Sequence, residues 1–103
     1  MKKAGCLQVV FSRAVPGVTE AAVLDAFART QQVMDGHPAL VRRELHRLGD
    51  GRWADMIWWT TAEGAQAAAA LVHGSDAGRA MGALFLPDGF EVLELTPLAA
   101  AEA

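Results

Sequence analysis

The run Trp53-Ala54-Asp55-Met56-Ile57-Trp58-Trp59 constrains the fold of this chain more than any other segment. Alternate residues of a β-strand point to opposite faces of a sheet. One face here carries Trp53, Ile57 and Trp59, and the other carries Ala54, Met56 and Trp58. A monomer rarely exposes so large an apolar patch, so one face must pack against helices and the other against a further partner. The segment therefore predicts a strand that is covered on both sides.

Turn and cap signals divide the rest of the chain into further elements. Pro16-Gly17 and Gly49-Asp50-Gly51 are turn sequences, and Thr60 with Glu63 forms a capping-box pattern at the start of a helix. The expected order is a strand at 6–11, a helix from Thr19 to about Asp35, strands at 40–48 and 52–59, a helix from Thr60 to Val72, a shorter helix from about Asp76 to Leu84, and a strand at 90–95. This order predicts an α+β ferredoxin-like βαββαβ fold, with a four-stranded antiparallel sheet and its helices on one face.

Length and composition indicate one packed domain that spans residues 1–103. The core is expected at about 5–97, and 98–103 is expected to be a frayed tail. Hydrophobic residues make up 52% of the 103 residues and charged residues 20%, which is typical of a globular protein. The net charge of −3 argues against nucleic acid or a membrane surface as a partner, because both require a dense basic face.

The N-terminal residues Met1-Lys2-Lys3 followed by Cys6 and Leu7 look like the beginning of a signal peptide. Gln8 and Arg13 interrupt the apolar run that follows, so we predict no export signal and a cytoplasmic protein. Cys6 is the only cysteine, which excludes an internal disulfide. We expect it to be a small buried side chain rather than a nucleophile.

Several segments resemble one protein superfamily. They are the run from Gly36 to Leu45, the Asp50-Gly51 turn, the run from Trp53 to Thr61, and the alanine-rich helix that follows. Together they resemble the dimeric α/β-barrel superfamily, and within it the antibiotic-biosynthesis-monooxygenase-like branch. The resemblance implies that two ferredoxin-like subunits pair as a homodimer and close a barrel. It also implies that the inner face of each sheet lines a cavity for a small molecule.

The resemblance leaves the reaction open, because the superfamily includes cofactor-independent oxygenases, haem-degrading oxygenases, lactone isomerases and dehalogenases. The haem-degrading branch has a histidine after the second helix, where this sequence has Met81 and Gly82. Its polar position on the first strand corresponds at best to Gln8. The histidines of this chain also lack the spacing of a metal site. We therefore expect no cofactor, neither haem nor metal.

Two candidate catalytic residues, His46 and Asp55, depend on the length of the hairpin loop. A two-residue loop at Asp50-Gly51 places His46 opposite Asp55, whereas a three-residue loop places Leu45 there. We favour the shorter loop. A His–Asp pair can hold the imidazole in one tautomer, ready to accept a proton from a phenol or an activated CH group. The alternative is an ion pair or hydrogen bond that only satisfies the Asp55 carboxylate.

Three residues are candidates for binding a substrate. Trp53 and Trp59 would form aromatic walls suited to a flat molecule, or else ordinary core. Gln8 could donate a hydrogen bond to a substrate carbonyl, or be satisfied within the protein. Trp58 is expected on the opposite face, beneath the helices.

Two further sets of side chains are not assigned to the site. His73 is expected to complement the helix dipole at the end of its helix. The arginines near the hairpin, Arg42, Arg43, Arg47 and Arg52, are expected to be mainly solvated, although a carboxylate-bearing ligand could use them.

Three functions remain open. The first is a cofactor-independent monooxygenase-like enzyme that acts on a small aromatic or polyketide-like substrate. The second is a non-catalytic or stress-type protein that binds a ligand in the same cavity without turnover. The third is a structural dimerisation module whose interior is filled by Trp53, Trp59 and Ile57.

Overall fold

The computed structural model describes residues 2–103, and Met1 of the predicted domain lies outside this range. The elements are β1 (Cys6–Ser12), α1 (Glu20–Met34), β2 (Leu40–Arg47), β3 (Trp53–Trp59), α2 (Ala62–His73), α3 (Asp76–Gly82) and β4 (Glu91–Leu95). The predicted order of strands and helices is confirmed, including the short helix after Ser75. Residues 96–103 form neither helix nor strand.

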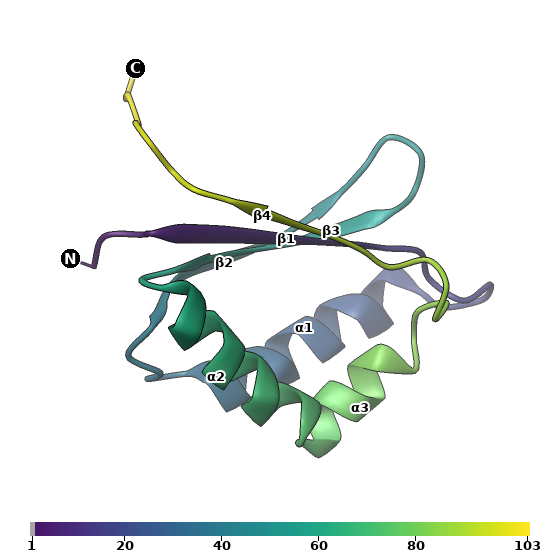
Figure 1. Ribbon diagram of the computed structural model, residues 1–103. Coiled ribbons are helices and arrows are strands. Elements are labelled where there is room, and N and C mark those ends of the chain that lie inside the picture. Colours follow the sequence, from purple (N-terminus) through teal and green to yellow (C-terminus); the bar gives the residue numbers. More distant parts are fainter. Residues whose placement is uncertain (1) are drawn as a thin grey trace.

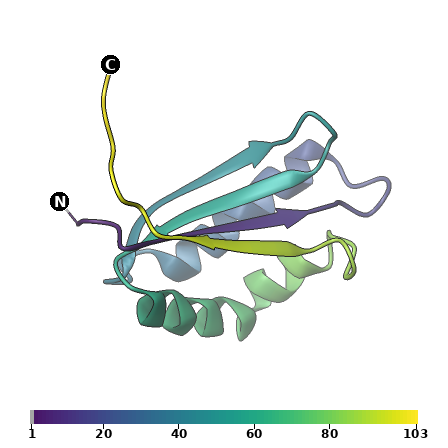
Figure 2. The ribbon, with the colours of Figure 1, turned by 45° about the horizontal axis from the view of Figure 1, so that its top comes forward.

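The four strands of the described chain form one antiparallel sheet in the order β2-β3-β1-β4. Helices α1, α2 and α3 lie against the same face of this sheet (Figure 1). A view turned toward the opposite face shows the four strands without a helix in front of them (Figure 2). The predicted α+β ferredoxin-like fold is therefore confirmed, with two layers of secondary structure. No helix among residues 2–103 has the length and apolar character needed to cross a membrane.

Side-chain caps fix the starts of the helices. Thr19 Oγ1 accepts a hydrogen bond from the Ala22 amide at 3.1 Å at the start of α1. Helix α2 is capped by Thr61, whose hydroxyl accepts from the Gly64 amide at 3.0 Å, and not by Thr60 as the capping-box pattern predicted. The reason is that the Thr60 amide still donates to the Ala39 carbonyl at 2.9 Å, which continues the contact between β3 and the start of β2.

The hairpin between β2 and β3 has a three-residue loop, so the favoured two-residue loop is wrong. The Leu48 amide donates to the Arg52 carbonyl at 2.8 Å, which leaves Gly49, Asp50 and Gly51 in the loop. Gly51 has φ 89°, the left-handed conformation that commonly closes a three-residue hairpin. Asp50 accepts hydrogen bonds from the amide and the guanidinium of Arg52, and these bonds hold the pKa of the Asp50 carboxyl below its ordinary value.

The additional loop residue turns the side chains of β2 to the opposite face from the one predicted. Leu45 now lies opposite Asp55, and His46 lies opposite Ala54. Arg43, on the same face as Leu45, lies opposite Ile57. The side of the sheet that carries Asp55 therefore receives an arginine in place of a histidine.

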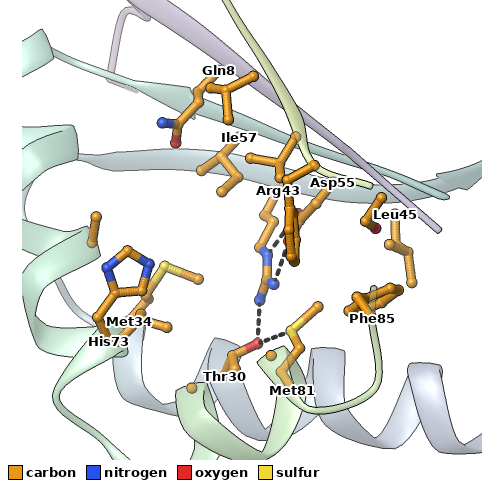
Figure 3. Close-up of a pocket in the computed structure, with 18 of the residues that line it drawn as sticks. Gln8, Thr30, Met34, Arg43, Leu45, Asp55, Ile57, His73, Met81 and Phe85 are labelled. Carbon is orange, nitrogen blue, oxygen red and sulfur yellow. Dashed lines mark hydrogen bonds and ion pairs between the residues drawn. The ribbon is translucent and has the colours of Figure 1, made fainter. Parts of the chain in front are cut away.

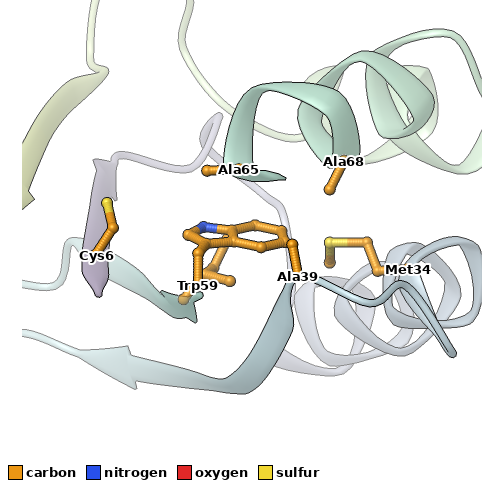
Figure 4. Packing of buried hydrophobic residues seen from close by; sticks show 7 residues of the cluster. Cys6, Met34, Ala39, Trp59, Ala65 and Ala68 are labelled. Carbon is orange, nitrogen blue, oxygen red and sulfur yellow. The ribbon is translucent and has the colours of Figure 1, made fainter. Parts of the chain in front are cut away.

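Two buried clusters fill the space between sheet and helices. Trp59 packs with Cys6, Met34, Ala39, Ile57, Ala65 and Ala68 (Figure 4). Trp53 packs with Val23 and Phe85. Trp53, Ile57 and Trp59 thus face the helices, and the prediction that Trp58 would lie beneath them is wrong. The small side chains of Ala65 and Ala68 leave room under α2 for the Trp59 indole, which is 1% exposed.

The other side of the sheet, here named the open face, is largely apolar. Its register places side chains from β1, β3 and β4 on it: Leu7, Val9, Phe11, Met56, Trp58 and Leu93. Arg42, Glu44 and His46 of β2 continue the same face at its edge. Leu93 is 43% exposed, so this face leaves apolar surface in contact with solvent in a single subunit.

Candidate functional site

A cavity of about 410 Å³ lies between the sheet and the helices. Its wall includes members of both buried clusters, among them Ile57 and Trp59 from one and Phe85 from the other. Most of the lining side chains are apolar. The polar side chains on the wall are Gln8, Ser12, Thr30, Arg43, Asp55 and His73. Ile57 and Trp59 therefore border this space between sheet and helices and do not fill it.

Arg43 and Asp55 form a bidentate ion pair on this wall (Figure 3). Arg43 Nε donates to Asp55 Oδ1 at 3.0 Å, and Nη2 donates to Oδ2 at 2.7 Å. The Arg43 side chain is 4% exposed and that of Asp55 is 15% exposed. A planar guanidinium matches the two carboxylate oxygens in geometry as well as charge, which makes this the strongest kind of side-chain hydrogen bonding. Asp55 is thus satisfied by an ion pair, but with Arg43 and not with His46.

The same guanidinium ties the sheet to α1. Arg43 Nη1 donates to the Phe27 carbonyl at 3.1 Å and to Thr30 Oγ1 at 3.0 Å. The guanidinium carbon also lies 4.0 Å from the centre of the Phe27 ring, in a cation–π contact. Thr30 Oγ1 in turn lies 3.5 Å from the sulfur of Met81 in α3. Figure 3 shows the Arg43 side chain extending from the sheet to Thr30 across this part of the cavity.

The predicted catalytic pair of His46 and Asp55 does not exist in this structure. His46 lies on the open face, where its Nε2 is 2.7 Å from Glu44 Oε1. Hydrogen bonds from His46 and then from Arg42 lower the pKa of the Glu44 carboxyl. His46 and Asp55 are on opposite sides of the sheet because the hairpin loop has three residues rather than two.

The three predicted substrate-binding residues differ in where they lie. Gln8 and Trp59 line the cavity, and Trp53 is not part of its wall. The Trp59 indole nitrogen has no hydrogen-bond partner among the described residues. In Figure 4 this nitrogen is on the side of the ring toward Cys6 and Ala65, away from Met34. Trp59 therefore offers the cavity apolar ring surface.

His73 lines the cavity wall, whereas its place at the end of a helix predicted only an interaction with the helix dipole. In Figure 3 its imidazole lies next to Met34 and is directed toward the space between sheet and helices. The residue is exposed, so it lies where the cavity meets solvent. The lack of a histidine at Met81 and Gly82 therefore does not mean that the cavity lacks an imidazole, because His73 supplies one. The phase of α2 could have indicated this position, since Ala69 and Val72 of the same helix also line the wall.

Cys6 lies in the cluster around Trp59 and is not part of the cavity wall. Burial, followed by the nearby negative charge of Glu94, raises the pKa of the Cys6 thiol. A protonated thiol is a poor nucleophile, in line with the predicted role as a small buried side chain. Within residues 2–103, no three His, Cys, Asp or Glu side chains are grouped to hold a metal ion.

The ion pair makes Asp55 a residue on which stability depends. Asp55→Asn leaves the buried Arg43 charge uncompensated, and we expect a loss of about 3 kcal/mol of unfolding free energy, or a fall in Tm of more than about 10 °C. Asp25→Asn is the matched control, because Asp25 also pairs with an arginine, Arg29 at 2.8 Å, but on the exposed surface of α1. Thermal denaturation of the two variants measures the difference. Equal melting temperatures would contradict the ion pair described here.

Comparison with solved structures places this architecture among known proteins. A variant of SnoaB, a cofactor-independent oxygenase from Streptomyces nogalater, is 24% identical with a TM-score of 0.73, over 94% of this chain and 97% of that chain. The ActVA-Orf6 monooxygenase of Streptomyces coelicolor, in complex with nanaomycin D, is 16% identical with a TM-score of 0.68, over 97% of this chain and 93% of that chain.

A variant of MhuD with two manganese protoporphyrin IX groups bound per active site is 17% identical with a TM-score of 0.71, over 95% of this chain and 99% of that chain. No protein-family model matches the sequence, and no curated protein matches it. The predicted resemblance to antibiotic-biosynthesis-monooxygenase-like proteins is thus confirmed at the level of the fold: this chain has the ferredoxin-like fold of these oxygenases.

Proposed function

We propose that this protein binds a small, flat aromatic molecule in its cavity and oxidises it with molecular oxygen, without a resident cofactor. The observation that carries the proposal is the cavity itself, which is mostly apolar and has one fixed ion pair on its wall. Its volume of about 410 Å³ is within the range of roughly 300–1,000 Å³ found for small-molecule sites. Similarity in fold to SnoaB and to ActVA-Orf6 supports this choice of reaction.

The reaction proposed here needs only substrate and oxygen. A CH₂ group between aromatic rings loses a proton to give an electron-rich anion, which reduces O₂. One oxygen atom becomes the carbonyl oxygen of the product and the other leaves in water, so that CH₂ and O₂ give C=O and H₂O. The substrate supplies all four electrons, and the protein has to bind the ring, accept a proton and stabilise the anion.

Side chains on the wall can fill these roles. Trp59 offers ring surface for stacking, and Gln8 can donate a hydrogen bond to a carbonyl of the substrate. His73 takes the place of His46 as the proton acceptor, because its imidazole lies between the cavity and solvent. Both oxygens of Asp55 accept hydrogen bonds from Arg43, so Asp55 positions the guanidinium and is not the base.

Oxidation of dithranol, a dihydroxylated anthrone, tests this proposal. We expect the protein to accelerate oxygen uptake, measured with an oxygen electrode, above the spontaneous rate. Ala69→Leu adds bulk to the cavity wall and should reduce affinity about tenfold or more. Ala67→Leu is the matched control, since Ala67 is an exposed residue of the same helix that does not line the cavity. His73→Gln should lower the rate about a hundredfold with little change in binding.

The same assay separates the alternatives. In one outcome the native protein binds dithranol, with weaker binding in Ala69→Leu, but does not accelerate oxygen uptake. That result would support a non-catalytic ligand-binding protein instead of an enzyme. Equal effects of Ala69→Leu and Ala67→Leu would place the ligand outside this cavity and reject the proposal.

Haem is the second candidate ligand, and the exposed imidazole of His73 on the wall is the observation that favours it. The fit to the remaining residues is poor. Haem is wider than a tricyclic aromatic molecule, and Arg43 spans from the sheet to Thr30 through four hydrogen bonds that a wider ring would have to displace. Titration with haemin should therefore give no stoichiometric Soret shift. A Soret shift that His73→Ala abolishes would replace the oxygenase proposal with haem binding.

We also propose that two copies of this chain pair through their open faces. The support is the apolar surface left on that side of the sheet, together with the dimer implied by the superfamily resemblance. In this arrangement the open faces cover one another, and each cavity lies on the far side of its own sheet. The barrel interior is then the dimer interface, not the ligand site.

Leu93→Glu tests the dimer, because Leu93 is exposed on the open face and a charge there does not disturb a buried core. We expect the native protein to be a dimer and Leu93→Glu to be a folded monomer in size-exclusion chromatography with light scattering. Leu71→Glu, at an exposed position of α2, is the control and should remain dimeric. A monomeric native protein, or a dimeric Leu93→Glu variant, would exclude this interface.

A further inference from the structure

The Arg43 guanidinium has one more hydrogen-bond donor than the protein uses. Arginine carries five N–H groups. Four are engaged: Nε and one N–H of Nη2 by Asp55, and the two N–H groups of Nη1 by the Phe27 carbonyl and Thr30 Oγ1. The second N–H of Nη2 has no acceptor within residues 2–103. Because the Arg43 side chain is almost fully buried, this N–H is a desolvated donor, and it belongs to a residue of the cavity wall.

This donor is held rigidly. Asp55 accepts from Nε and Nη2 along one edge of the guanidinium plane, and Thr30 and Phe27 both accept from Nη1. The Phe27 ring covers one side of the plane at 4.0 Å. A donor whose position is fixed by so many contacts loses little entropy when a ligand binds, which is how preorganised sites gain affinity and selectivity.

The charge of the pair also matters for what can enter. Asp55 offsets the formal charge of Arg43, so a ligand meets an oriented N–H dipole and not an isolated cation. A neutral aromatic molecule can therefore enter the apolar cavity without displacing Asp55 from Arg43. An oxygen atom of that ligand that gains negative charge within the cavity is then stabilised by the hydrogen bond, since bonding to the charged form favours it.

We infer that Arg43 is the anchoring residue of the cavity, and that it selects ligands with an acidic oxygen, such as a phenol or an enol, which it binds as the anion. This inference rests on the proposed function and adds to it the class of substrate. Both members of the ion pair then act in binding: Arg43 contacts the ligand, and Asp55 positions Arg43. A ligand without an ionisable oxygen fits the same cavity and lacks this contact.

The ionisation of a bound dye tests the inference. The probe is β-hydroxyanthraquinone, whose phenolate absorbs at longer wavelength than its phenol, and β-methoxyanthraquinone is the non-ionisable control. With the native protein, we expect the ionisation midpoint of the bound hydroxyl compound to lie about one pH unit below that of the free compound. The affinity for the hydroxyl compound should rise with pH across this range, and that for the methoxy compound should stay constant.

Two variants assign the effect to Arg43. Arg43→Met with Asp55→Leu replaces both members of the buried pair by apolar side chains, a change that is often neutral for stability. This double variant should bind both quinones and show no shift of the ionisation midpoint. Arg43→Lys keeps a cation next to Asp55 without the planar fork of donors, so it should shrink the shift, and it serves if the double variant does not fold.

Each result decides between distinct conclusions. Binding of both quinones to the native protein without a shift would overturn the role of Arg43 and leave the proposed function standing. A shift that persists in the double variant, or an undiminished shift in Arg43→Lys, would also overturn it. Binding of neither quinone to the native protein would reject the cavity as an aromatic site, and the inference with it.

Discussion

The buried guanidinium of Arg43 links the parts of the molecule that form the cavity. It is bonded to β3 through Asp55 and to α1 through Phe27 and Thr30, so it sets how sheet and helix are held around this space. Removal of either charge would leave the other buried without a partner, which is far more costly than the loss of an exposed pair. The pair therefore constrains the sheet, the first helix and the chemistry of the cavity at once.

Three residues of a turn decide that Arg43 is in this position. Gly51, in its left-handed conformation, completes a loop of three residues and shifts β2 by one residue relative to β3. As a result Arg43 and Leu45 face the helices, and Glu44 and His46 lie on the open face. A two-residue loop would place Glu44 and His46 beneath the helices and the Arg43 guanidinium on the open face.

The order of the elements could be predicted because its signals are local. Turn residues such as Gly49-Asp50-Gly51, the caps Thr19 and Ser75, and the length of each apolar run depend only on neighbouring residues. Which face of β3 packs against the helices could not be predicted from the sequence. The strand carries tryptophan on both faces, so its alternation does not distinguish them. The contacts of Trp59 with the small residues of α2 settle that question, and they are long-range.

The site was predicted less well than the fold for the same reason. The period of two predicts Asp55 and Trp59 on one face of their strand, and both line the cavity, as does the candidate Gln8 on the first strand. The partner of Asp55 depended on one residue of loop length, which turn sequence alone did not determine. His73 was missed because its position on the wall depends on how α2 packs over the sheet.

We propose that the ligand binds between sheet and helices within one subunit, and not on the open face. The three tryptophans report on this directly, since Trp59 lines the cavity and Trp58 lies on the open face. Their indole N–H signals can be followed by NMR in ¹⁵N-labelled protein during titration with β-methoxyanthraquinone, after assignment with single Trp→Phe variants. We predict that the Trp59 signal shifts in a saturable way and that the Trp58 signal does not. A saturable shift of the Trp58 signal with an unchanged Trp59 signal would place the ligand on the open face instead.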